Sequence, residues 1–327
     1  MSVVERSPTY KPFKYPWAVQ IAEVSEKMNW IEQEADLTDD VRQMNDGTIL
    51  PEEKNLVLEI MKTFTQSDAE VATGYIEYFL PTFKNNEIRQ MLLSIASREG
   101  IHQRAYALFS DTIGLPDDSY RAFLEYEVLS EKIEKMTEMD MSTNKGITKS
   151  IARTVISEGV SLFGAFVMLL NFQRHGKLTG LSKINEWSIK DESLHVEGMI
   201  QLFHTFVTEN PEVVTDELKR EIYQMFRDAI ELEDRFVDLA FAMGPVHGLT
   251  KEEVKQYIRY IADRRLIQLG LKGNYDIKDN PLPWLDWIIS GDNMTNFFEQ
   301  RVSDYSAAGL TGSWGWEETT NSNLKDK

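Results

Sequence analysis

Residues 181–207, LSKINEWSIKDESLHVEGMIQLFHTFV, decide the expected fold. Apolar residues recur along this stretch every three or four positions, which is the spacing of one face of an α-helix. The same spacing recurs in the blocks 51–80, 85–112, 117–139, 146–174, 214–242 and 250–269. Blocks near 30 residues without a sustained heptad pattern are typical of a large bundle whose core lies between antiparallel helices. The sequence therefore predicts an all-α helical bundle with additional helices.

Residues that start and stop helices agree with these blocks. Pro51-Glu52-Glu53 suits a helix N-terminus, Gly114-Leu115-Pro116-Asp117 separates two blocks, and Asn210-Pro211 separates two more. The composition outside the blocks divides the chain into three parts. Residues 1–20, with three prolines, are expected to form an extended N-terminal arm, residues 21–290 the helical domain, and residues 291–327 a flexible C-terminal segment.

Charge and cysteine content exclude several classes of partner and site. The 327 residues include 53 acidic and 35 basic side chains, and a net charge of −18 would repel nucleic acid and anionic membranes. No stretch approaches the roughly 20 uninterrupted apolar residues of a membrane span, and the first residues lack the pattern of a signal peptide. We therefore expect a cytoplasmic protein. Because the chain has no cysteine, any metal must be held by oxygen and nitrogen.

Two of the five histidines follow a glutamate by three positions, in Glu99-Gly100-Ile101-His102 and Glu192-Ser193-Leu194-His195. At about 100° per residue, positions i and i+3 share a helix face, so each pair can present a carboxylate and an imidazole to one point. A single Glu-x-x-His arises by chance on charged helices. Two copies on separate long helices are instead typical of a di-metal site in a bundle.

Such a site takes one further carboxylate from each of two other helices. Asp68 and Glu158 fit this role, because each lies among apolar residues in the block before a Glu-x-x-His block. Four carboxylates and two imidazoles favour iron or manganese over structural zinc. The alternative is that these are exposed helix charges and two ordinary histidines. The remaining histidines, His175, His204 and His247, lack the pattern and are interpreted as surface or packing residues.

Tyr106 lies four residues after His102 and seven after Glu99, so its phenol is expected near the metals. A buried tyrosine at helical spacing is usually part of a core. Beside an oxygen-activating cluster, however, it is the side chain best able to lose an electron and a proton. Leu162, Phe163 and Phe166 could shield that phenol, and core packing explains them equally well.

These segments resemble the small subunit of class I ribonucleotide reductases, a member of the ferritin-like di-metal carboxylate proteins. Ser67-Asp68, Glu99-x-x-His102 with Tyr106, Glu158-Gly159 and Asp191-Glu192-x-x-His195 look like the four ligand segments of that family, in its order. The stretch 257–266, YIRYIADRRL, looks like its late-helix signature. The resemblance covers most of the chain and implies a ferritin-like fold.

The resemblance also implies the roles of individual residues. Asp68, Glu99 and His102 would bind one metal ion, and Glu158, Glu192 and His195 the other. Tyr106 would hold a stable radical. Trp30 matches the tryptophan that passes the electron hole outward, and Asp191 matches the acid that links it to His102. Taken alone, Trp30 is an ordinary core aromatic and Asp191 an ordinary charged residue.

The C-terminal segment and the partners are implied in the same way. Tyr305, the last tyrosine, is a candidate relay residue, and Trp314 to Glu318 is a candidate docking peptide. Ribonucleotide reduction in the family needs redox-active thiols, which this chain lacks, and no Gly-rich phosphate loop is present. The resemblance therefore implies a large catalytic subunit as partner, together with a homodimer. An activating flavoprotein is a further possible partner.

Two other classes of function stay open at this point. A ferritin-like di-metal oxidase or desaturase could use the same six ligands on an apolar substrate, and a deep apolar tunnel to the metals would favour it. An iron-storage or assembly protein would bind many irons in a large cage. For the metals, iron is favoured, while di-manganese and mixed Mn/Fe centres accept the same ligands.

Overall fold

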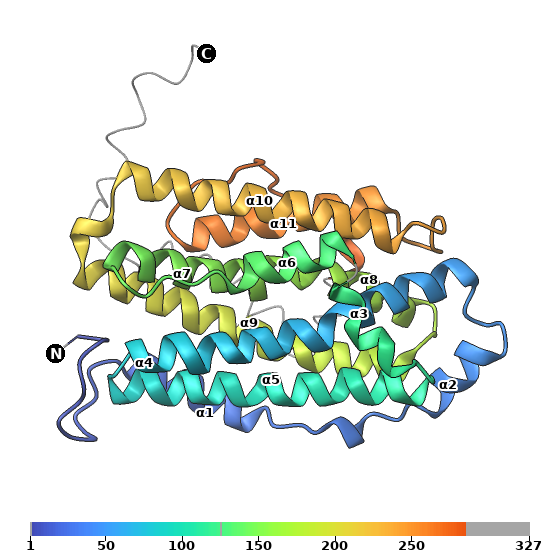
Figure 1. The fold of residues 1–327 in the computed structure, drawn as a ribbon, viewed down its shortest axis with the longest axis horizontal. Helices are drawn as coiled ribbons and strands as arrows, with labels where there is room; N and C mark the ends of the chain where they lie inside the picture. Colours follow the sequence, from blue (N-terminus) through green and yellow to red (C-terminus); the bar gives the residue numbers. More distant parts are fainter. Residues whose placement is uncertain (1, 125, 286–327) are drawn as a thin grey trace, which may run out of the picture. The chain divides into compact units, whose positions relative to one another are not determined.

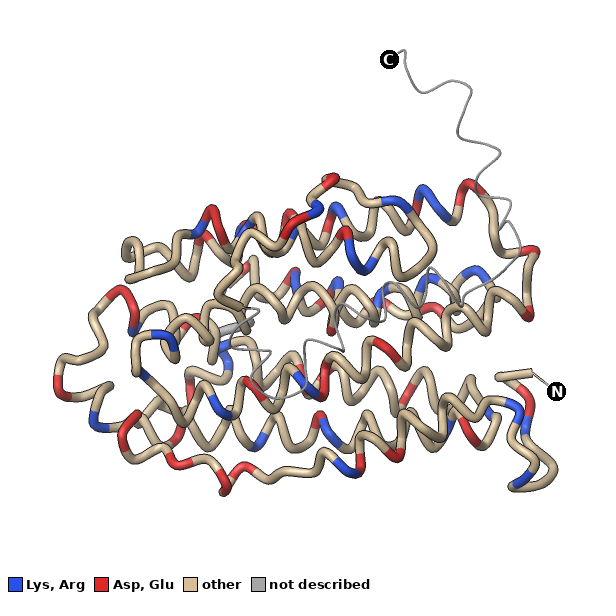
Figure 2. The backbone as a smooth tube through the Cα atoms, turned by 180° about the vertical axis from the view of Figure 1, so that it is seen from behind, with Lys and Arg blue, Asp and Glu red and all other residues tan. Residues whose placement is uncertain are grey.

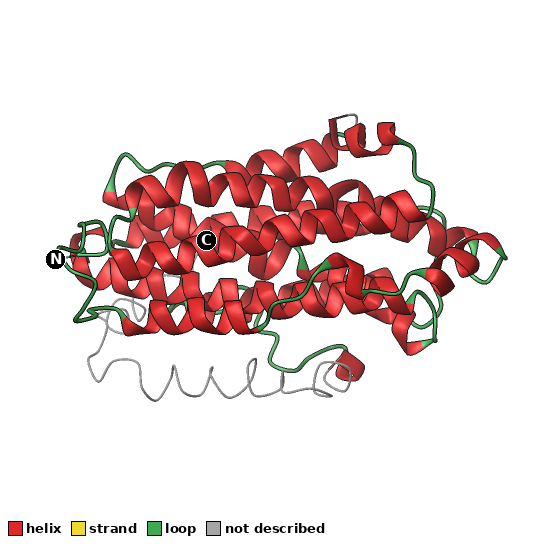
Figure 3. Cartoon of the chain, turned by 90° about the horizontal axis from the view of Figure 1, so that it is seen from below, coloured by secondary structure: helices red, strands yellow, loops and turns green. Residues whose placement is uncertain are grey.

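The computed structural model describes residues 2–124 and 126–285. In these ranges the chain forms helices and a single isolated antiparallel bridge between Val246 and Leu249. The principal helices are α1 (Pro16–Lys27), α2 (Thr38–Asn45), α3 (Pro51–Gly74), α4 (Leu80–Thr82), α5 (Asn86–Thr112), α6 (Glu127–Thr137), α7 (Asn144–Ile156), α8 (Phe163–Arg174), α9 (Thr179–Glu209), α10 (Asp216–Ala240) and α11 (Lys251–Gln268). The predicted all-α class is confirmed (Figure 3).

Three short 3-10 segments and two π-helical segments lie between these helices. The 3-10 segments are η1 (Glu32–Glu34), η3 (Asp117–Leu124) and η5 (Pro211–Val213). The π-helical segments are η2 (Tyr75–Phe79), which follows α3, and η4 (Ser157–Ser161), which connects α7 to α8. A π-turn inserts an extra residue into a helix and often marks a functional site. Both π-segments lie in blocks that the apolar spacing predicts as continuous helix.

The centre of the bundle consists of α3, α5, α9 and the continuous unit α7–η4–α8. Helix α3 packs along α5, α5 contacts α9, and α9 packs against both α7 and α8 (Figure 1). The additional helices α10 and α11 pack on each other and against α7 and α8. This arrangement brings together the four blocks in which the sequence places the metal ligands.

Local capping explains where several of these helices begin. Asn85 accepts hydrogen bonds from the backbone N–H groups of Glu87 and Ile88 at the start of α5, and Thr143 does the same for Gly146 at α7. Thr250 and Glu253 form a reciprocal capping box at α11. Each cap satisfies backbone donors that have no partner within the helix and contributes about 1 kcal/mol.

The unit α7–η4–α8 is the apolar centre of the molecule. The segment Asn144–Arg174 is long and apolar enough to cross a membrane, yet every residue of its most apolar window is buried inside the structure. In α8, every residue from Phe163 to Phe172 is buried. Large aromatic side chains such as Phe109, Phe163 and Phe236 fill the space between neighbouring helices. Charged side chains of both signs are interspersed along the backbone (Figure 2).

Besides the two π-segments, the structure differs from the sequence-based expectation at two places. Helix α1 begins at Pro16, inside the segment 1–20 that the prolines suggest is extended, because proline is well tolerated at the first helical position. The block 117–139 is not a single helix but the 3-10 segment η3 followed by α6. Tyr120 of η3 donates a hydrogen bond of 2.8 Å to Asp111, and its hydroxyl also lies 3.3 Å from the Ala107 carbonyl of α5. These contacts join η3 to α5.

Candidate metal centre

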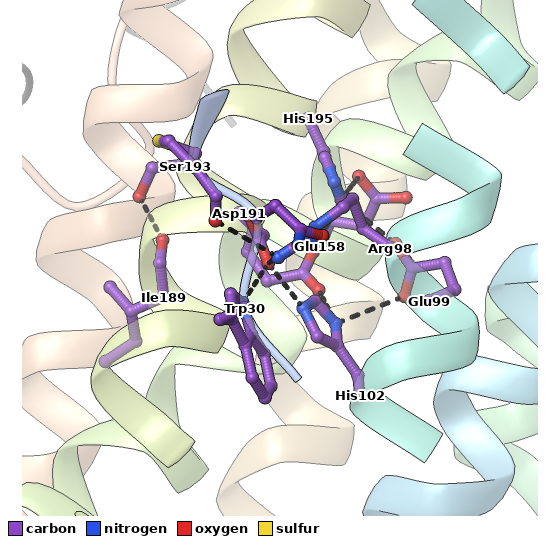
Figure 4. A network of polar contacts seen from close by, with 12 residues as sticks. Trp30, Arg98, Glu99, His102, Glu158, Ile189, Asp191, Ser193 and His195 are labelled. Atoms are coloured by element: carbon purple, nitrogen blue, oxygen red, sulfur yellow. Dashed lines mark hydrogen bonds and ion pairs between the residues drawn. The ribbon is translucent and has the colours of Figure 1, made fainter. Parts of the chain in front are cut away.

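All six predicted metal ligands meet in the core. Asp68 comes from α3, Glu99 and His102 from α5, Glu158 from η4, and Glu192 and His195 from α9. Each of these side chains is at most 2% exposed (Figure 4 labels Glu99, His102, Glu158 and His195). The i, i+3 spacing works as expected, because the glutamate and histidine of each pair lie one turn apart on the inner face of a helix.

The ligand atoms form two overlapping groups. Atoms of Asp68, Glu99, His102 and Glu192 all lie within 4.8 Å of one another, and so do atoms of Glu99, Glu158, Glu192 and His195. Glu99 and Glu192 belong to both groups. The arrangement therefore fits two neighbouring metal ions, with these two glutamates able to reach both.

The polar atoms of this cluster lack the partners that buried groups normally have. In the part of the chain that the structure describes, both carboxylate oxygens of Glu99 and of Glu192 have no hydrogen-bond partner, and neither do Asp68 Oδ2, Glu158 Oε2 and the Nδ1 atoms of both histidines. His102 Nδ1 lies 3.1 Å from Glu192, and His195 Nδ1 lies 3.0 Å from Glu99, but these contacts lack hydrogen-bond geometry. Buried polar groups are otherwise nearly always satisfied, so the cluster fits bound cations.

Burial and mutual repulsion also shift the proton affinities of the cluster. Burial raises the pKa of Asp68 and of Glu158 well above the usual values, and neighbouring carboxylates add to the shift. Burial alone would lower the pKa of His102 and His195, but contacts with carboxylates raise both pKa values well above 6.5. Two divalent ions would place positive charge beside these carboxylates and favour their ionised, metal-binding form.

Asp191 lies directly behind His102 and is a shared acceptor. Its Oδ2 atom lies 3.1 Å from His102 Nε2 and accepts hydrogen bonds from Trp30 Nε1 at 2.8 Å and from Arg98 Nη2 at 3.0 Å (Figure 4). Burial would raise the Asp191 pKa, but the hydrogen bond with His102 and the nearby positive charges hold it below the usual value. The Trp30 ring also stacks on the His102 ring at 5.8 Å and packs on the Trp187 ring at 5.1 Å with a tilt of 33°. The structure thus brings Trp30 and Asp191 to the cluster.

Tyr106 is buried beside the Asp68 end of the cluster. Its ring packs 4.7 Å from Phe64, which in turn packs 5.4 Å from Phe166. Its hydroxyl has no hydrogen-bond partner among the described residues. Burial, followed by the Asp68 charge, raises the pKa of Tyr106, so the phenol keeps its proton. Phe166 reaches Tyr106 through Phe64, which the sequence argument did not include, while Leu162 and Phe163 are buried in the surrounding core.

Two residues of the site escape the sequence argument. Arg98 directly precedes Glu99 in the sequence. A charged residue within a block of apolar spacing was the feature that could have indicated its buried ion pair with Asp191. Tyr75 donates a hydrogen bond of 2.7 Å to Glu158 Oε1. It lies seven residues after Asp68, so two helical turns placed it on the ligand face.

The other predicted residues lie away from the cluster. His204 Nε2 contacts the Gln268 carbonyl, and His175 packs on His247. None of these three histidines belongs to the ligand groups, which agrees with their interpretation as surface or packing residues. Tyr305 and the candidate docking peptide Trp314 to Glu318 lie outside the described residues.

Comparisons with known proteins agree with this geometry. The family described as ribonucleotide reductase, small chain, matches residues 7–281. A probable ribonucleoside-diphosphate reductase small subunit of Invertebrate iridescent virus 3 is 37% identical over 94% of this chain and 86% of its own length. The ribonucleoside-diphosphate reductase subunit beta of Chlamydia pneumoniae is 29% identical over 91% of this chain and 90% of its own.

Solved structures share the fold. The ribonucleotide reductase R2 subunit of Clostridium botulinum superposes with a TM-score of 0.81 and 24% identity, over 88% of this chain and 93% of that one. The dimanganese(II)-NrdF of Streptococcus sanguinis gives a TM-score of 0.74 and 19% identity, over 83% and 94% of the two chains. With 275 consecutive residues, 7–281, matched by the family and a helical bundle in common, the chain belongs to the small-chain family of ribonucleotide reductases.

Proposed function

We propose that this protein binds two metal ions and generates a radical on Tyr106, which a large catalytic subunit uses for deoxyribonucleotide synthesis. The observation that carries the proposal is the pair of overlapping ligand groups that share Glu99 and Glu192, with Tyr106 at one side and Asp191 behind His102. A ligand cluster alone would suit any di-metal carboxylate protein. The redox-capable side chains packed around it favour the reductase subunit.

The roles of the ligands follow from their positions. Asp68 and His102 would hold one ion, and Glu158 and His195 the other, while Glu99 and Glu192 could contact both. When bound and activated by oxygen or an oxygen-derived oxidant, the ions supply one-electron oxidising power. Iron is the favoured metal, and manganese or a mixed pair fits the same donors.

Tyr106 is the proposed radical site because it is buried, protonated and shielded from solvent. Forming the radical breaks the phenol O–H bond and removes one electron and one proton from this side chain. Phe64 and Phe166 form part of an apolar wall on the ring. Such a wall keeps water and external reductants away, which is how a protein environment prevents side reactions of a reactive group.

The outward path would use the hydrogen-bonded series His102, Asp191 and Trp30. Asp191 contacts both of the others through a single oxygen, so the series is continuous. Tyr305 is the proposed last relay residue. The proposed partners are the large subunit and a second copy of this chain, with an activating flavoprotein as a further candidate, and the proposed location is the cytoplasm.

The proposal is tested with the large subunit of the same system. The metal-loaded protein should support reduction of a ribonucleoside diphosphate, and Tyr106→Phe should bind the same amount of metal without supporting the reaction. Full activity of Tyr106→Phe would overturn the radical assignment. Failure of the unmodified protein to bind metal would overturn the metal centre itself.

A further inference from the structure

Glu158 differs from the other glutamates of the cluster in how its oxygens are used. Its Oε1 atom accepts the hydrogen bond from the Tyr75 phenol at 2.7 Å, while Oε2 has no hydrogen-bond partner among the described residues. Glu99 and Glu192, by contrast, have both oxygens without such a partner. Oε2 is therefore the oxygen of Glu158 that has no hydrogen-bond donor competing with a metal ion.

The position of the Tyr75 side chain is fixed by its packing. Its side chain is 1% exposed, and its ring packs on Phe79 at 5.6 Å. It is the first residue of the π-segment η2, which continues α3 beyond Asp68, while Glu158 lies in the other π-segment, η4. Helix α3 thus contributes a ligand at one end of the cluster and, two turns later, a phenol at the other end.

The phenol is also fixed in its role as the donor. The Tyr75 hydroxyl is the donor in the 2.7 Å contact with Oε1. A carboxylate that binds a metal ion is ionised and can only accept hydrogen bonds, so Tyr75 remains the donor when the ion is bound. A hydrogen bond to a charged acceptor is among the stronger ones in proteins.

We propose that Tyr75 is a positioning residue of the metal centre, which occupies Oε1 of Glu158 so that this ligand binds its metal ion through Oε2 alone. The inference rests on the proposed function and deepens it. Glu158 becomes a terminal one-oxygen ligand, while Glu99 and Glu192 remain free to bridge. Hydrogen-bond partners of metal ligands typically change metal affinity by about 10–100-fold when removed.

The test is a titration of the full-length metal-free protein with Mn²⁺, followed by metal analysis and electron paramagnetic resonance. The unmodified protein should bind about two Mn²⁺ per chain. Tyr75→Phe should bind one of the two ions about 10–100-fold more weakly. The spectrum of its doubly loaded form should differ from that of the unmodified protein, because a Glu158 free to use both oxygens changes the coordination of one ion.

Tyr15→Phe is the matched control. Tyr15 is also buried, and its hydroxyl also hydrogen-bonds a glutamate, Glu209, which is not part of the cluster. This control should keep both affinities and the spectrum. If Tyr75→Phe matches Tyr15→Phe in affinity and spectrum, Tyr75 only fills space and the inference is overturned, while two bound ions leave the proposed function intact. Fewer than two ions in the unmodified protein would overturn both.

A crystal structure of the unmodified protein with Mn²⁺ gives a result that does not depend on how a variant folds. The inference expects Oε2 of Glu158 on the metal and Oε1 still on Tyr75. Both oxygens of Glu158 on metal, with the Tyr75 hydroxyl turned away, would contradict it.

Discussion

The indole nitrogen of Trp30 donates a hydrogen bond of 2.8 Å to Asp191, a residue 161 positions later in the chain. Trp30 lies just beyond the end of α1, whereas Asp191 lies in the middle of α9 next to the ligand Glu192. Both side chains are buried, at 3% and 1% exposure. The contact therefore joins the segment after the first helix to the ligand His102, which shares the same Asp191 oxygen.

Trp30→Phe should separate radical formation from radical transfer. Phenylalanine keeps part of the stacking on His102 but cannot donate to Asp191. We expect the variant to bind metal and form the Tyr106 radical, yet to support no nucleotide reduction with the large subunit. The matched control is Trp187→Phe, since the Trp187 ring packs on Trp30 but takes no part in the hydrogen bonds to Asp191 described above. Equal activity of the two variants would argue against Trp30 as the relay.

Asp191→Asn should lower the free energy of unfolding, because it leaves the buried Arg98 guanidinium without its carboxylate. Removing one partner of a buried ion pair costs about 3–5 kcal/mol, and we expect a loss near the lower end because Arg98 also donates to Asn29 and to the Met28 carbonyl. Urea denaturation measures the loss. Glu131→Gln breaks a half-exposed pair with Arg235 and should cost less than about 1 kcal/mol. Similar losses in both variants would contradict the account.

Lys132 and Glu233 form a second buried ion pair, next to the π-segment that carries Glu158. Lys132 Nζ lies 2.8 Å from Glu233 and donates to the Ser161 carbonyl at 2.9 Å. Lys132→Met should destabilise the protein by about 3–5 kcal/mol, since it leaves a buried carboxylate unpaired. The double variant with Glu233→Leu should recover most of this loss. A double variant no more stable than Lys132→Met would show that the pair does not act as a unit.

The pH dependence of that single variant follows from Glu233. Burial raises the pKa of Glu233, and Lys132 opposes the shift. An acid whose pKa is higher in the folded state binds a proton on folding, so its contribution to stability falls as the pH rises above the unfolded value of about 4.5. Lys132→Met raises this pKa further. Its stability deficit relative to the unmodified protein should therefore grow from about pH 5 upward, as thermal unfolding at several pH values would show.

Removal of metal should make stability depend on pH in the same direction. Asp68, Glu158, His102 and His195 all have a pKa raised in the metal-free fold, whereas the Glu99 pKa is lowered by its two histidine neighbours against the effect of burial. The four groups with raised pKa outnumber the two with lowered pKa, Glu99 and Asp191, so folding takes up protons. The metal-free protein should lose stability as the pH rises from about 4, through the usual carboxylate and histidine pKa values.

Metal should reverse this trend, because the ligands bind metal in their deprotonated forms. A metal concentration 100 times the dissociation constant stabilises the fold by about 2.7 kcal/mol. Melting curves with Mn²⁺ and with a chelator, at pH 5 and at pH 7.5, provide the measurement. We expect Mn²⁺ to stabilise the protein more at pH 7.5 than at pH 5. A larger stabilisation at pH 5 would contradict the proposed metal centre.

Much of the centre could be predicted because its ligands follow helix geometry. Glu99 with His102, and Glu192 with His195, need only the i, i+3 relation, and Asp68 and Glu158 follow from the order of the blocks. Tyr75 was not predicted, because it lies 83 positions from its hydrogen-bond partner Glu158. The bond also depends on the local geometry of the two π-segments that carry these residues. Arg98 was missed for a similar reason, since its partner Asp191 becomes its neighbour only in the packed bundle.

In the fold, too, features set by local spacing could be predicted, whereas features set by tertiary contacts could not. The apolar spacing locates the long helices, but it cannot distinguish a π-turn from an α-turn when both bury the same residues, as at Ser157–Ser161. Nor does it separate the 3-10 segment Asp117–Leu124 from α6, because the interactions of Tyr120 with α5 are tertiary contacts.

The most direct test of the central claim is electron paramagnetic resonance of the full-length protein after anaerobic metal loading and exposure to oxygen, together with metal analysis. The account predicts about two iron or manganese ions per chain. It also predicts a tyrosyl signal that is absent in Tyr106→Phe, which should keep both ions. A protein that binds two ions and forms no radical, with iron and oxygen or with manganese and an activating oxidant, would contradict the account and favour a di-metal oxidase instead.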